Sequence, residues 1–108
     1  MTERHLKAAD VPAETPIATT EGGREFTRAI LENEPEMDID LARQDNIDAA
    51  LVLKNSNPDL GALVLECTNM CPYARDIARA TSLPVFSIID FVTWFQAGLS
   101  PRRFADPD

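Results

Sequence analysis

The hydrophobic positions follow two different patterns along the chain, with a change near residue 61. Before that point, apolar residues recur at helical spacing between polar ones. The pattern predicts three short elements, namely a polar helix at 1–10, a brief extended segment at 16–20 and a helix at 24–31. Gly22-Gly23 predicts a tight backbone turn before the third of them.

Seven acidic residues are spread over the next segment, at Glu32, Glu34, Glu36, Asp38, Asp40, Asp45 and Asp48. A metal site is one interpretation, but the glycine and closing glutamate of a calcium-binding EF-hand loop are absent. Acidic residues also favour the first turn of a helix, because that end carries a partial positive charge. We therefore predict no metal site. We predict instead a helix capped by Asp38 or Asp40 that reaches about Asn55, with an apolar side suited to a sheet face.

After residue 61 the apolar residues form short, nearly continuous runs, as in the buried strands of parallel sheets. Residues 62–67 and 84–89 are predicted as strands, and a helix that begins at Pro72 is predicted between them. Asp90 is predicted to cap a last helix, which Gly98 and Pro101 would end. Strand, helix, strand and helix in this order predict an α/β fold, with a parallel sheet and flanking helices.

The last helix carries an aromatic stripe at Phe91, Trp94 and Phe95, with Leu99 one further turn along. This spacing is typical of a core or an interface, and we prefer that interpretation to a cofactor platform. Residues 101–108 are predicted to be a flexible tail. With 108 residues and 44% hydrophobic residues, the chain has room for one compact domain.

Charge and hydropathy exclude several classes of partner. The net charge of −8 argues against nucleic acid and against an anionic membrane surface, because both need clustered Lys and Arg. The chain has no apolar run near the roughly 20 residues that span a bilayer, and its first residues have no signal-peptide core. We therefore expect a cytoplasmic protein with reduced cysteines.

Cys67 is the main candidate for chemistry, because it ends the first predicted strand just before a helix. Ligands of open α/β sheets bind at this edge. Backbone N–H groups there can hold a carboxylate, and the helix end can lower the pKa of a thiol. Thr68 and Asn69 add polar side chains, whereas strand alternation places Glu66 on the opposite face.

A simpler interpretation of Cys67 is packing, since free cysteines are often buried. With Cys71 it forms a CxxxC pair, which is neither the CxxC of redox proteins nor a zinc pattern without further ligands. His5 is far away in sequence, so a Cys–His pair would require the N-terminus to fold across the site.

The segment GALVLECTNMCPYARDIARATSLPVFSIIDFVTWFQAGLSPRRF resembles the C-terminal part of aspartate/glutamate racemase family proteins. LECTN is similar to the second cysteine motif of that family, and TPIATTEGGREFTRAIL is similar, more loosely, to a segment that precedes it. The resemblance covers most of this chain but about half of a usual member. It implies one half of a pseudo-symmetric fold, with residues 61–100 as the best-matched core.

The resemblance also implies a reaction. In this family, which has hydantoin racemases, maleate isomerases and arylmalonate decarboxylases among its relatives, two cysteines work on opposite faces of a substrate α-carbon, without pyridoxal phosphate or metal. Cys67 would be one of these thiols, and Thr68 and Asn69 would bind the substrate carboxylate. Two departures stand out: residues 1–61 contain no cysteine, and Cys71 stands where a residue such as proline is expected.

These observations lead to two hypotheses. The first is a cofactor-independent amino-acid racemase or isomerase with a cysteine acid/base and a small carboxylate-bearing substrate, incomplete because the first catalytic cysteine is missing. The alternative is a non-catalytic carboxylate-binding or dimerisation module derived from a racemase half. The missing face would come from a second copy, with two Cys67 residues about a two-fold axis, or from an N-terminal half.

Overall fold

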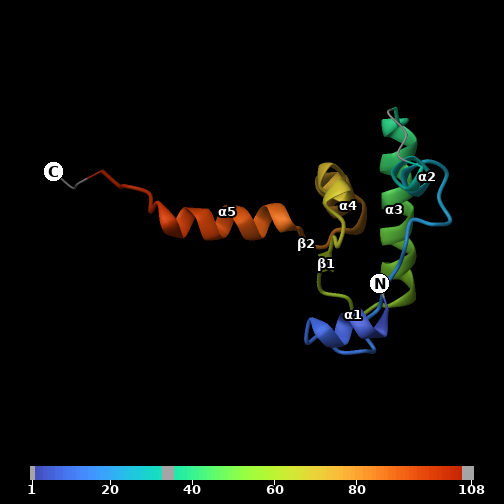
Figure 1. Ribbon diagram of the computed structural model, residues 1–108, viewed down its shortest axis with the longest axis horizontal. Helices are drawn as coiled ribbons and strands as arrows, with labels where there is room; N and C mark the ends of the chain where they lie inside the picture. Colours follow the sequence, from blue (N-terminus) through green and yellow to red (C-terminus); the bar gives the residue numbers. More distant parts are fainter. Residues whose placement is uncertain (1, 33–35, 106–108) are drawn as a thin grey trace. The chain divides into compact units, whose positions relative to one another are not determined.

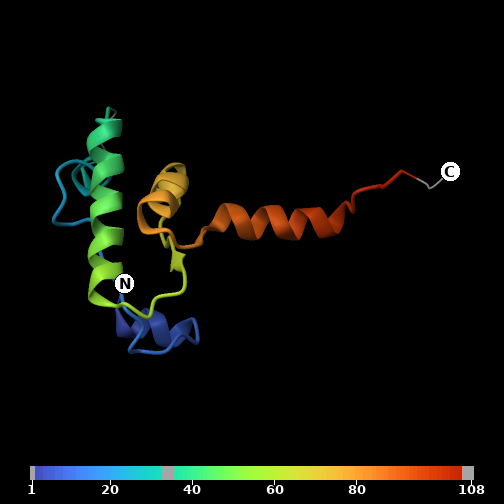
Figure 2. The same cartoon turned by 180° about the vertical axis from the view of Figure 1, so that it is seen from behind.

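The fold is mixed helix and strand, in a computed structural model that describes residues 2–32 and 36–105 (Figures 1 and 2). The chain divides into two compact units, Met1–Leu60 and Gly61–Asp108, which are called here the N-terminal unit and the C-terminal unit. The predictions for Glu34 and for the last part of the tail, 106–108, lie outside the described residues.

The N-terminal unit is helical, and its elements are α1 (Glu3–Ala8), α2 (Phe26–Leu31) and α3 (Ile39–Ser56). All three helices were predicted. In α1 the backbone N–H of Thr2 donates to Nδ1 of His5 at 3.0 Å, so the only histidine caps its own helix. No strand forms at 16–20, a segment that the structure describes throughout.

Helix α3 has the boundaries that its local signals indicate. The side chain of Asp38 accepts the backbone N–H of Leu41 at 3.0 Å and caps the first turn. The helix stops before Asn57, and the N–H of Leu60 turns back to the carbonyl of Asn57 at 3.1 Å. Asp38 or Asp40 was predicted as the cap of this helix, and the structure shows that it is Asp38.

The buried side of α3 differs from the expected apolar one. Its buried residues are Ala42, Asp45 and Asn46, and α3 packs against α2, where Phe26 and Ala29 are buried. The apolar residues predicted to cover a sheet are only half-buried, and they are Leu41, Ile47, Ala50, Leu51 and Leu53. Their role against a sheet face stays a prediction.

The C-terminal unit has the predicted order of strand, helix, strand and helix. It comprises β1 (Leu63–Val64), a 3₁₀ helix η1 (Thr68–Tyr73), α4 (Ala74–Thr81), β2 (Val85–Phe86) and α5 (Ile88–Leu99). The two strands pair in parallel, with Leu63 opposite Val85 and Val64 opposite Phe86. The parallel sheet is confirmed at this coarse level.

Both strands are shorter than predicted, because helical turns follow them closely. The prediction of a strand at 84–89 is wrong after Phe86, since Ser87 is the N-cap of α5. The N–H of Ser87 donates to the carboxylate of Asp90 at 2.8 Å, which is a capping box. Asp90 is thus the third residue of the helix and not its N-cap. The prediction that a helix begins at Pro72 is wrong by two residues, since Pro72 lies inside η1 and α4 begins at Ala74.

The packing of the C-terminal unit is uneven. Its buried residues are Leu63, Tyr73, Ile77 and Thr81. Residues opposite one another in a parallel pair share a face of the sheet, so Leu63 lies on a covered face while Val64 and Phe86 lie on an exposed one.

Helix α5, described over its whole length, buries none of its 12 residues. Of the two predicted roles of its aromatic stripe, core or interface, the structure shows no core, and the interface stays a proposal. Among the described residues, we find no helix with the length and apolar character to cross a membrane.

Candidate functional site

Cys67 lies beyond the sheet, at the edge where the two strands end. The last ladder hydrogen bond of β1 runs from the N–H of Leu65 to the carbonyl of Phe86 at 2.8 Å. The chain then leaves the sheet, and Cys67 becomes the N-cap of η1, with φ −98° and ψ 132°. The prediction of a strand that ends on Cys67 is wrong by three residues, but the residue stands next to the carboxyl edge, where open α/β sheets bind ligands.

Two backbone donors follow the thiol directly. The carbonyl of Cys67 accepts the N–H of Met70 at 3.0 Å, which closes the first turn of η1. Within the part of the chain that the structure describes, the N–H groups of Thr68 and Asn69 donate no hydrogen bond, as expected for the first residues of a 3₁₀ helix. Both residues are exposed and Cys67 is half-buried, so an incoming acceptor can reach these donors beside the thiol.

The second cysteine belongs to the same short segment. Cys71 lies four residues after Cys67, inside η1, and its carbonyl accepts the backbone N–H of Ala74, the first residue of α4. Both cysteines are half-buried free thiols. The structure brings together the three predicted site residues, Cys67, Thr68 and Asn69, together with Cys71, on one connection between β1 and α4.

Glu66 lies beyond the strand whose alternation was predicted to place it on the opposite face from Cys67. β1 ends at Val64, and the ladder hydrogen bonds end at Leu65. Alternation therefore says nothing about Glu66, whose side chain is exposed. Sequence reasoning also missed Ser87, which is half-buried at the end of β2, at the same carboxyl edge of the sheet. The signal that could have identified it is the Ser-x-x-Asp capping box.

A buried acidic residue with several hydrogen-bond partners, Asp45, lies in the N-terminal unit. Its carboxylate accepts three backbone N–H groups, from Arg24 at 2.8 Å, from Glu25 at 2.6 Å and from Phe26 at 2.9 Å. The side chain of Asp45 is 1% exposed, and the guanidinium of Arg24 lies 3.7 Å from it. This carboxylate ties the start of α2 to α3.

Burial alone would raise the pKa of Asp45, because a low dielectric disfavours the charged form. The backbone donors Arg24, Phe26 and Glu25, together with the charge of Arg24, outweigh burial and hold the pKa below its usual value. Asp45 is thus an ionised structural residue. It fills the donor cluster at the start of α2 itself, which leaves that cluster closed to an external anion.

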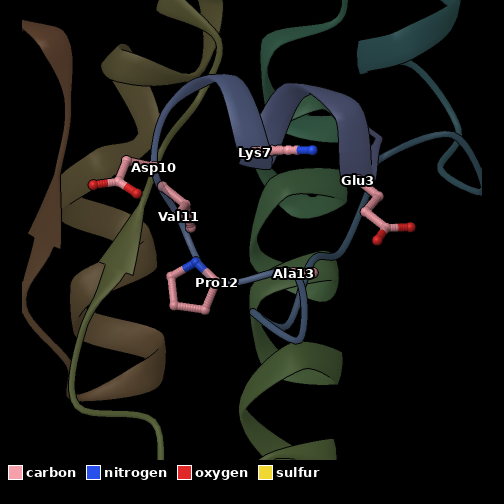
Figure 3. A pocket seen from close by; sticks show the side chains of 6 residues that line it. All are labelled: Glu3, Lys7, Asp10, Val11, Pro12 and Ala13. Atoms are coloured by element: carbon pink, nitrogen blue, oxygen red, sulfur yellow. The ribbon is translucent and has the colours of Figure 1, made fainter.

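A hollow of about 310 Å³ lies elsewhere, beside α1 and the loop after it. It is lined by Glu3, Lys7, Asp10, Val11, Pro12 and Ala13 (Figure 3). The carboxylates of Glu3 and Asp10 point to opposite sides in this view. All but one of the lining residues are exposed, so the hollow offers no enclosed, convergent polar groups. It contains none of the predicted site residues.

The part of the acidic segment that the structure describes, residues 36–48 and Glu32, forms no cluster of metal ligands. Among the described residues, no three or more histidine, cysteine or acidic side chains come together as possible ligands. The acids that the structure describes serve other purposes, such as the cap at Asp38 and an ion pair of Asp40 with Arg43 at 2.7 Å.

Comparison with known proteins shows a similarity to a lyase. The chain is 30% identical, over 76 residues, to a dimethylsulfoniopropionate lyase from Durusdinium sp. clade D. The aligned part is 68% of this chain, and the chain spans about a quarter (25%) of that relative's length. No family model matches the sequence, and no solved structure matches the fold.

Proposed function

We propose that this chain carries the acid/base thiol of a cofactor-independent enzyme that works on the carbon next to a carboxylate. Cys67 is the proton carrier, and the backbone N–H groups of Thr68 and Asn69 hold the carboxylate. The observation that carries the proposal is a half-buried thiol followed directly by two donors that have no partner among the described residues, at the carboxyl edge of a parallel sheet.

The chemistry requires these groups together. Removal of a proton from a carbon next to a carboxylate places negative charge on the carboxylate oxygens, and N–H donors aimed at those oxygens stabilise that charge. A thiolate accepts the proton and becomes a thiol, which is general base catalysis. A small carboxylate-bearing molecule is the substrate class that fits two donors and one thiol.

The racemase-like reaction is supported by the resemblance of LECTN and its surroundings to the second cysteine motif of aspartate/glutamate racemase family proteins. Inversion at carbon needs a second proton donor on the opposite face. Residues 1–61 hold no cysteine, and Cys71 belongs to the same short 3₁₀ helix as Thr68 and Asn69. In this version, the second thiol comes from a second copy of the chain or from an N-terminal half.

A lyase is the second candidate, and the similarity to a dimethylsulfoniopropionate lyase favours it. In such an elimination one base takes the proton next to the carboxylate, and the C–H electron pair forms a carbon–carbon double bond. The carbon–sulfur bond breaks and its electron pair leaves with dimethyl sulfide. This step needs one thiol on one face, so Cys67 meets its demand without a partner thiol.

Proton exchange in D₂O tests the step that both candidates share. The full chain is incubated with aspartate, glutamate, a hydantoin or dimethylsulfoniopropionate, and the proton next to the carboxylate or carbonyl is followed by NMR. We expect exchange with one of these compounds, and we expect Cys67→Ser to slow it about 100-fold or more, the usual range for loss of a general base. Cys71→Ser is the matched control, and its exchange rate stays within a factor of about three.

The product identifies the reaction. Inverted amino acid indicates the racemase-like reaction, and dimethyl sulfide indicates the lyase. Exchange that persists in Cys67→Ser contradicts the role of Cys67. Failure of all four compounds to exchange, combined with carboxylate binding that shifts the amide resonances of Thr68 and Asn69, would favour the non-catalytic module derived from a racemase half.

A further inference from the structure

An apolar surface without a partner follows the length of α5. It is called here the α5 surface and consists of Ile88, Phe91, Val92, Phe95 and Leu99, which lie on one side of the helix, together with Trp94 beside them. Each of the six side chains is exposed, from 47% at Ile88 to 72% at Trp94. The capping box of Ser87 and Asp90 stabilises the first turn of this helix. The apolar side of the helix therefore forms, although no other part of the described chain buries it.

The area of this surface is close to what a stable dimer needs. From the side-chain size of aromatic residues and these exposed fractions, the α5 surface presents roughly 600 Å². The largest apolar patch on a typical monomer is about 300–600 Å² and is often functional. Two such surfaces pressed together would remove about 1,200 Å² from water, the lower end of specific protein–protein interfaces.

The charged side chain of α5 lies away from the α5 surface. This is Asp90, which at helical spacing lies on the opposite side of the helix, where its carboxylate accepts the N–H of Ser87. The helix dipoles favour an antiparallel pair over a parallel one. With a net charge of −8, two copies repel over most of their surface, but the α5 surface itself is uncharged.

We propose that α5 pairs with α5 of a second copy of this chain, antiparallel and about a two-fold axis near Phe95. Each copy then contributes the same surface, and every contact occurs twice. The pairing is independent of the reaction proposed for Cys67, so either can fail without the other.

Sedimentation equilibrium and tryptophan fluorescence test the pairing on the full chain. Trp94 is the only tryptophan, so its emission reports on the α5 surface alone. We expect the mass of a dimer at tens of micromolar, the affinity range of a small interface. With the same concentration dependence, we expect a blue shift of Trp94 emission and weaker quenching by acrylamide.

Substitutions identify the surface. Phe95→Glu, which acts twice in a symmetric dimer, should raise the dissociation constant at least about 100-fold. Val52→Glu, an exposed apolar residue of α3 (62%), is the matched control and should change it less than about threefold. Circular dichroism confirms that each variant keeps its helices.

Three outcomes would overturn the proposal. A monomer at 100 μM with freely quenched Trp94 would show that the surface stays bare. A monomer with shielded Trp94 would show that the chain covers α5 itself. A dimer that tolerates Phe95→Glu would show that another face makes the contact.

Discussion

The N-terminal unit and the C-terminal unit differ in how far their helices are packed against other elements. In the N-terminal unit, α2 and α3 are tied together by the buried carboxylate of Asp45, which satisfies three backbone N–H groups. In the C-terminal unit, α5 is capped at its start by Ser87 and Asp90 but buries none of its described residues. The first unit closes on itself, whereas the second forms its elements and leaves one of them uncovered.

The difference shows that local helix signals and tertiary packing are separate requirements. Caps and spacing are enough to define where α5 begins and ends. Burial requires a second surface, and a 12-residue helix gains most of its stability in water from such packing. Substitution of one buried residue in each unit, Asp45 in the first and Ile77 in the second, measures how much such packing contributes to stability.

The largest expected effect is the loss of the anchor in the N-terminal unit. Asp45→Ala leaves the N–H groups of Arg24, Glu25 and Phe26 without their acceptor, and we expect a loss of about 4 kcal/mol of unfolding free energy. This is a large part of the stability of any small unit. Urea unfolding followed by circular dichroism measures it, and hydrogen exchange of the α2 and α3 amides localises it.

Asp48→Ala is the matched control, because the side chain of Asp48 on the same helix is 56% exposed. Its effect should stay within about 0.5 kcal/mol. An equal effect of both substitutions would mean that Asp45 acts through surface charge and not through its three backbone donors.

The next effect concerns the apolar anchor of the C-terminal unit. Ile77 is 1% exposed, and Ile77→Ala should cost about 3 kcal/mol through lost burial and the cavity left behind. Hydrogen exchange of the α4 amides measures the loss. Ile89→Ala, at a residue that is 58% exposed, should change the same amides by less than about 0.5 kcal/mol. If the two variants behave alike, the covered face of the sheet is not what stabilises this unit.

A smaller effect on stability is expected when the pH is lowered. The pKa of Asp45 is lower in the folded than in the unfolded chain, so its contribution to stability is complete above the unfolded value of about 3.9 and is lost as the pH falls through the folded value. Thermal unfolding between pH 7 and pH 2 should show a steeper acid loss for the wild type than for Asp45→Asn. Parallel curves would contradict an ionised Asp45.

Helix α3 could be predicted well because its signals are local. The cap at Asp38 and the apolar spacing that predicts an end near Asn55 lie within the helix or next to it, and the observed ends, Ile39 and Ser56, agree with them. The strand predicted at 84–89 was too long because it, too, was predicted from local signals alone. A short apolar run does not distinguish a buried strand from the start of a helix, and the Ser87 cap turned Ile88 and Ile89 into helix.

Long-range pairing limited the prediction of polar sites. Asp45 was grouped with six other acidic residues of its segment, because its partners are backbone groups about 20 residues away that the sequence pattern does not reveal. Cys67 was placed near the carboxyl edge of the sheet from the order of elements. Its position beyond the ladder, at the start of a 3₁₀ helix, depends on a connection whose geometry the residue pattern does not encode.

The space beside Gly23 links two positions that are far apart in the sequence. A Cβ at residue 23 would lie 2.6 Å from Cγ of Asp45, although Gly23 has an ordinary negative φ. The glycine is therefore required for room and not for backbone freedom. During evolutionary drift, a larger residue at 23 is acceptable only after position 45 has become smaller, and that change removes the acceptor for α2. Related chains should therefore keep or lose Gly23 and Asp45 together, so that correlated substitution at these two positions becomes a record of this contact.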